Sequence, residues 1–160
     1  MSEQPLPFTG PIVVGFDDHV TSRRALLQAV DLAERLQVHL RVVHVLDAED
    51  VPVDPDSSQW DAERQRHAEQ LARDVHELVR LPDRAWSYAS ATGEVWKALT
   101  REAHDLDAWL IVIGQHTHAH TVATAVGRLL RGSWGGSATD TLVHHSRLSV
   151  LVVPHHDDEA

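Results

Sequence analysis

The chain has 160 residues, enough for one compact domain and too few for two. Its 14 Lys and Arg against 24 Asp and Glu give a net charge of −10, which argues against binding to nucleic acid because that function needs a basic surface. The absence of cysteine excludes disulfides, thiol catalysis and iron–sulfur clusters. No apolar run approaches the roughly 20 residues that span a bilayer, and the N-terminal segment lacks a signal-peptide pattern, so we expect a cytoplasmic protein without membrane contact.

Short apolar runs alternate along the chain with stretches whose apolar residues recur at helical spacing. The runs predict strands because they are rich in β-branched residues and are bounded by Gly, Pro or Asp. In chain order, the predicted strands are residues 11–16, 38–46, 85–90, 109–113 and 148–153. Helices are predicted between them, starting at Thr21 or Ser22, at Ser57 or Ser58, at Gly93 and at Ser137. Loops are expected at 47–59 and 115–135, and flexible tails at 1–10 and 155–160.

This alternation predicts a single α/β domain over residues 1–160. Strands joined through helices run parallel, so we expect a doubly wound, five-stranded parallel sheet with helices on both faces. In such folds ligands bind outside the carboxyl ends of the strands, at the point where the strand order reverses. The residues that follow the first and fourth predicted strands are therefore the candidates for a functional site.

Asp17 directly follows the first predicted strand. Its carboxylate can accept a hydrogen bond from an amine or a hydroxyl of a ligand, or it can form an Asx-turn ahead of the helix. The dinucleotide fingerprint G-x-G-x-x-G is absent from this turn, and the chain contains no P-loop motif.

A segment rich in His, Thr and Gly follows the fourth predicted strand. It begins at Gly114 and contains two Gly-Ser pairs, Gly132–Ser133 and Gly136–Ser137, before the last helix. Glycine lets the main chain approach a ligand closely and a helix N-terminus favours an anion, so this turn is suited to phosphate; alternatively, the glycines serve only the geometry of the turn. Arg128 and Arg131 either pair with phosphates or remain solvated.

Three histidines alternate within the same segment: His116, His118 and His120. In an extended chain they would lie on one side, at a spacing compatible with a metal ion. The alternative is a polar insertion that binds nothing, and the sequence shows no clear fourth ligand. We therefore expect no physiological metal site. If the chain did bind a metal ion, these three histidines would be the candidate ligands.

Five segments of the chain, taken together, resemble the universal stress protein family in their order and spacing. They are residues 12–26, 41–46, 92–94, 109–114 and 136–154. The resemblance implies the strand order 3-2-1-4-5 and a homodimer formed through the last strand, Leu148 to Val153. An apolar edge strand left open is prone to association, which fits such a dimer.

The ATP-binding members of this family carry the motif G-x2-G-x9-G-[ST] after the fourth strand. Gly114 and the pair Gly136–Ser137 match its two ends, and Gly132–Ser133 is a rival for the second end. Here 21 residues separate Gly114 from Gly136, against 12 in the motif, and Gly127 is the displaced candidate for the middle glycine. The resemblance also implies that Asp17 and the main chain of Val45 hold the base.

Three functions remain open from the sequence. The favoured one is a small universal stress protein of the stress response that binds ATP with Mg²⁺ between the carboxyl ends of the first and fourth strands. The second is a family member that binds no nucleotide and contacts protein partners through residues 115–135, and the third is a metal binder that uses the histidine loop. Because neither a general base nor a P-loop lysine nor a carboxylate pair for a metal is evident, we expect no enzymatic activity beyond slow ATP hydrolysis.

Overall fold

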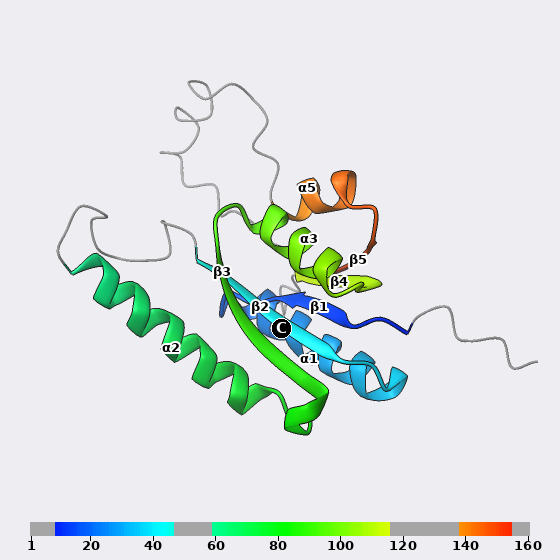
Figure 1. The fold of residues 1–160 in the computed structure, drawn as a ribbon, viewed down its shortest axis with the longest axis horizontal. Helices are drawn as coiled ribbons and strands as arrows, with labels where there is room; N and C mark the ends of the chain where they lie inside the picture. Colours follow the sequence, from blue (N-terminus) through cyan, green and yellow to red (C-terminus); the bar gives the residue numbers. More distant parts are fainter. Residues whose placement is uncertain (1–8, 47–58, 116–137, 155–160) are drawn as a thin grey trace, which may run out of the picture.

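The structure, a computed structural model, describes residues 9–46, 59–115 and 138–154. Within these residues, parallel strands form one sheet in the order β3-β2-β1-β4-β5 (Figure 1). The strands are β1 (Ile12–Gly15), β2 (Leu40–Leu46), β3 (Trp86–Thr92), β4 (Leu110–Gly114) and β5 (Ser149–Val153). The predicted α/β class and the strand order 3-2-1-4-5 are both confirmed.

The helices cover both faces of this sheet. They are α1 (Val20–Leu36), α2 (Trp60–Leu78), α3 (Val95–Asp105) and α5 (Ala138–His145), and a short 3₁₀ helix, η2 (Asp83–Ala85), precedes β3. Helices α1 and α2 lie on one face, and α3 and α5 lie on the other (Figure 1).

Successive side chains of the central strand enter two different cores. Ile12 and Val14 of β1 are fully buried in the core that contains α1, whereas Val13 is fully buried in the core that contains Leu99 of α3. This alternation is the period of a strand that is covered on both faces, and each buried side chain contributes about 1.5–3 kcal/mol. Packing on both faces therefore fixes β1 and the point at which its carboxyl end delivers Asp17.

The helix starts differ from those predicted. The N-cap residue of α1 is His19, without a side-chain cap, so the prediction that Thr21 or Ser22 caps this helix is wrong. Both side chains lie instead within the first turn, where they are 6% and 4% exposed. Helices α2 and α3 also begin slightly later than predicted, at Trp60 and Val95. Ser137, the predicted cap of the last helix, lies outside the described residues.

Candidate functional site

Strand β1 leaves the sheet at the point where the strand order reverses. It pairs with β2 on one side and with β4 on the other. The connection from β1 to β2 runs through α1 on one face of the sheet, and the connection from β3 to β4 runs through α3 on the other. Asp17 follows β1 and Gly114 ends β4, so both lie where a ligand crevice is expected in a fold of this class.

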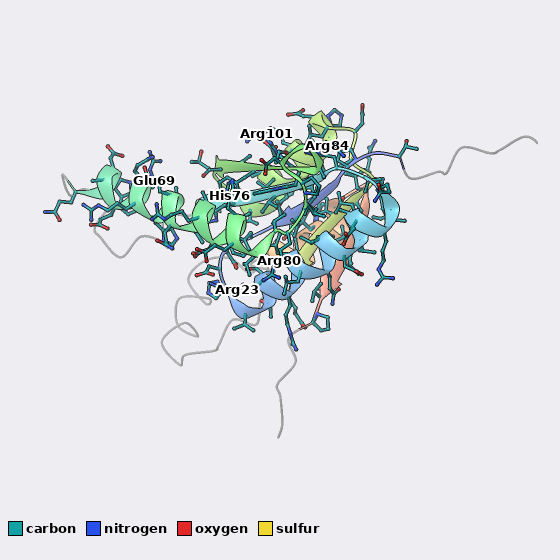
Figure 2. The ribbon with its side chains drawn as sticks, turned by 90° about the horizontal axis from the view of Figure 1, so that it is seen from below. Arg23, Glu69, His76, Arg80, Arg84 and Arg101 are labelled. Carbon is teal, nitrogen blue, oxygen red and sulfur yellow. The ribbon has the colours of Figure 1, made fainter. Side chains whose placement is uncertain are left out.

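Asp17 is partly buried, and its side chain is 30% exposed. Its Oδ1 accepts a hydrogen bond from the main-chain N–H of His19 at 3.1 Å and lies 3.2 Å from Nδ1 of the same residue. Asp17 thus forms the Asx-turn that the sequence offered as an alternative to ligand binding. This turn orients the carboxylate at the carboxyl end of β1. The neighbouring Asp18 has a positive φ of 67° and accepts a hydrogen bond from Nε of Arg23 at 2.6 Å; Arg23 lies near the start of α1 (Figure 2).

The main chain of Val45 also faces the carboxyl end of β1. The last pair in register between β1 and β2 is Gly15 with Val43, and β2 continues to Leu46. Phe16 donates its N–H to the carbonyl of Val43 at 2.9 Å, so the main-chain groups of Val43 face β1. Because alternate residues of a strand direct these groups to the same neighbour, those of Val45 also face the end of β1, where they can read the edge of a planar base.

Gly114 is required by the packing of α1 on β4. A Cβ at this position would lie 2.5 Å from the main-chain carbon of Thr21 and 2.7 Å from the nitrogen of Ser22. The absence of a side chain therefore lets the first turn of α1 approach the end of β4. This contact accounts for the glycine without any ligand.

Two further side chains at this site were not predicted from the sequence. The buried polar side chains of the described residues are Thr21, Ser22 and His44, and two of them bind the peptide unit that joins Phe16 to Asp17. Nδ1 of His44 lies 2.8 Å from the Phe16 carbonyl, and Oγ of Ser22 accepts the Asp17 N–H at 3.3 Å. Buried polar side chains therefore surround the peptide unit at the carboxyl end of β1.

Most of the predicted phosphate-binding residues lie outside the described residues. These are Gly127, Arg128, Arg131, Gly132, Ser133, Gly136 and Ser137, together with the candidate metal ligands His116, His118 and His120. Across residues 9–46, 59–115 and 138–154, no group of three or more His, Asp or Glu side chains is placed to hold a metal ion.

A separate groove of about 400 Å³ lies at the amino ends of the strands, opposite the end that carries Asp17. It is formed by the C-terminal ends of α3 and α5 and by the residues that lead into β4 and β5, among them His104, Ala108, His145 and Leu148. Since these are the amino ends of parallel strands, the groove is not the crevice expected for a ligand in this fold class.

Comparisons with known proteins agree with this architecture. The family model described as the universal stress protein family matches residues 9–154, and the chain therefore belongs to that family. A universal stress protein family member from Burkholderia pseudomallei is 23% identical, with a TM-score of 0.66 over 94% of this chain and 100% of that one. No curated protein matches the sequence significantly.

Two further neighbours in structure are described as complexes with nucleotides. A universal stress protein in complex with cAMP is 21% identical, with a TM-score of 0.63 over 90% of this chain and 96% of that one. The universal stress protein from Archaeoglobus fulgidus in complex with dAMP is 20% identical, with a TM-score of 0.62 over 91% of this chain and 98% of that one. At these identities the likeness establishes the fold. Within the described residues, none of the helices is both long enough and apolar enough to cross a membrane.

Proposed function

We propose that this universal stress protein binds an adenine nucleotide, with ATP as the first candidate, in the crevice between the carboxyl ends of β1 and β4. The observation that supports the proposal is that Asp17 directly follows β1, while the main chain of Val45 faces the end of the same strand, where the strand order reverses. The complexes of two structural neighbours with cAMP and dAMP support the choice of an adenine nucleotide.

The two groups supply complementary chemistry for a nucleoside. A carboxylate accepts hydrogen bonds from ribose hydroxyls or from an exocyclic amine, and a main-chain N–H with its neighbouring C=O matches the donor and acceptor on the edge of adenine. In the proposal, the phosphates extend past Gly114 toward the Gly-Ser pairs at 132–133 and 136–137. In the same proposal, Mg²⁺ enters with the phosphates of ATP.

The test compares Asp17→Asn with Asp18→Asn. Both changes remove one carboxylate from adjacent positions, and asparagine tolerates the positive φ of Asp18. At 100 times its Kd, Mg-ATP stabilises a binding protein by about 2.7 kcal/mol, which for a domain of this size raises Tm by about 5–10 °C.

We expect this shift for the wild type and for Asp18→Asn, and at least tenfold weaker binding for Asp17→Asn in titration calorimetry. The same titration with AMP and cAMP ranks the ligands. The proposal is refuted if none of the three nucleotides stabilises nucleotide-free wild-type protein.

We also propose that two copies of the chain associate through β5. This strand is the last in the sheet order, and it carries the uncharged sequence Ser-Val-Leu-Val-Val. Gln115 donates its N–H to the carbonyl of Val153 at 2.8 Å, so the main-chain groups of Val153 and Leu151 face β4, and those of Val150 face away from the sheet. An apolar edge of this kind favours pairing with a second strand.

Proline substitutions distinguish the two edges of β5. Val150→Pro removes an outward N–H and leaves the pairing with β4 intact, whereas Leu151→Pro removes a bond to β4. Sedimentation of the wild type should give a dimer and that of Val150→Pro a folded monomer, while Leu151→Pro should lower Tm. A monomeric wild type, or a dimeric Val150→Pro, would contradict this interface.

A further inference from the structure

One peptide unit at the site is held at both of its polar ends. The unit joins Phe16 to Asp17, at the end of β1. Its carbonyl accepts a hydrogen bond from Nδ1 of His44 at 2.8 Å, and its N–H donates to Oγ of Ser22 at 3.3 Å. His44 comes from β2 and Ser22 comes from α1, so two different elements fix this single peptide plane.

The chemistry of the contact assigns the tautomer of His44. A carbonyl oxygen can only accept a hydrogen bond, so Nδ1 of His44 must carry the proton. The ring is 1% exposed and meets the ring of His67 from α2 edge to face, with the centroids 5.9 Å apart. It is therefore held in place by packing as well as by its hydrogen bond.

Ser22 completes the arrangement from the other side. Its hydroxyl donates to the carbonyl of His19 at 3.1 Å, which leaves a lone pair to accept the N–H of Asp17. The residue is 4% exposed because the first turn of α1 lies against Gly114. The contact that requires glycine at the end of β4 thus also brings the Ser22 hydroxyl to the peptide unit.

From this geometry we propose that His44 and Ser22 are positioning residues, which clamp the Phe16–Asp17 peptide plane and thereby aim the Asp17 carboxylate at the nucleotide. The inference rests on the proposed function. Rotation of this plane would turn the Cα–Cβ bond of Asp17, whereas fixing it in advance spares the site the cost of ordering the carboxylate on binding. His44 also lies next to Val45, so the same imidazole ties together the two chain segments proposed to hold the base.

The decisive variants at position 44 differ in where they place a donor. Asparagine puts an amide N–H close to the position of Nδ1, glutamine puts it near Nε2, and leucine fills similar volume with no donor. Val42→Ala is the matched control, since Val42 lies fully buried on the same strand and the same face but is not part of the clamp. It lowers stability without removing the hydrogen bond.

Titration with Mg-ATP gives the first readout. We expect His44→Leu, His44→Gln and Ser22→Ala to bind at least tenfold more weakly than the wild type. His44→Asn should stay within about threefold of the wild type, and Val42→Ala should bind normally despite a lower Tm. Equal affinity of His44→Leu and the wild type would refute the clamp while leaving the proposed function intact, and loss of affinity in Val42→Ala would reduce the role of His44 to stability.

Amide hydrogen exchange gives a second readout that needs no ligand. In His44→Leu and in Ser22→Ala, the Asp17 amide should exchange at least tenfold faster, while the amide of Val112 in the centre of β4 stays protected. Unchanged exchange at Asp17 would overturn the clamp even if binding were weakened. A wild-type protein that binds no nucleotide would refute the proposed function, and with it the role of the clamp in binding.

Discussion

The close approach of α1 to β4 makes Gly114→Ala a demanding test of the geometry of the site. The added Cβ would meet the main-chain carbon of Thr21 at 2.5 Å, whereas ordinary van der Waals contact begins at 3.4 Å, so the first turn of α1 must recede by about 0.9 Å. The atoms in the way belong to main chain, which cannot rotate aside as a side chain does. Overpacking of this kind costs about 1–3 kcal/mol.

Gly15→Ala is the matched control for this change. Its Cβ would lie 3.1 Å from Cδ1 of Leu99, the end of a flexible side chain on the other face of the sheet. The same methyl group therefore has a neighbour that can move, and the cost should be smaller. Both glycines are at the carboxyl ends of central strands, so the two variants differ chiefly in what the methyl group meets.

Urea denaturation of both variants measures the difference. We expect Gly114→Ala to lose about 2 kcal/mol, or about 4–8 °C in Tm, with an unchanged m-value, and Gly15→Ala to lose less. Because Ser22 lies on the displaced turn, Gly114→Ala should also expose the Asp17 amide to faster exchange. A stability equal to that of the wild type, or a larger loss in Gly15→Ala, would refute the packing role assigned to Gly114.

Two further predictions concern charges away from the site. Burial raises the pKa of the Tyr88 phenol, and no described residue offers its hydroxyl a hydrogen bond. The unfolded chain then loses this proton at a lower pH than the native state, so stability should fall as the pH rises past about 10. Tyr88 is the only tyrosine in the chain, so its tyrosinate absorbance should appear at a higher pH in the native protein than in the unfolded chain. Tyr88→Phe should flatten the alkaline loss of stability without lowering Tm at neutral pH. Titrations that coincide in the native and unfolded protein would contradict the burial of Tyr88. Arg41 donates from Nε to Glu102 at 3.2 Å and so joins β2 to α3, with both side chains about a quarter exposed or less. A double-mutant cycle with Arg41→Met and Glu102→Gln should give a coupling of about 0.5–1 kcal/mol, and additive losses would show that the pair contributes nothing.

The sequence predicted the sheet because its signal is local and repeated. The β-branched runs at 109–113 and 148–153 have the composition of strands buried between helices, and their alternation with helical stretches permits few other topologies. The position of Asp17 followed from the same pattern, since a residue after the first strand of a doubly wound sheet lies near the point where the strand order reverses. These inferences needed only distances along the chain.

The start of α1 could not be predicted in the same way. Thr21 and Ser22 are residue types that favour the N-cap, but both are buried by the contact with Gly114, and His19 takes the cap position without a side-chain capping bond. A tertiary contact with a strand far along the chain therefore overrides the local capping preference. His44 was missed for a related reason: it stands within the apolar run of β2, and its partner is a main-chain carbonyl 28 residues away.

Gly114 shows why a motif residue can persist independently of the ligand. In the family motif it is the first glycine of the phosphate-binding segment, but here its lack of a side chain is already demanded by the main chain of Thr21 and Ser22. A family member that had lost nucleotide binding would still need glycine at this position to keep α1 against β4. The presence of Gly114 thus carries little weight for nucleotide binding, and the proposal depends instead on the charge of Asp17, because asparagine at this position would keep the Asx-turn with His19 while removing the carboxylate. For that reason the comparison of Asp17→Asn with Asp18→Asn separates function from fold, and a substitution of Gly114 alone does not.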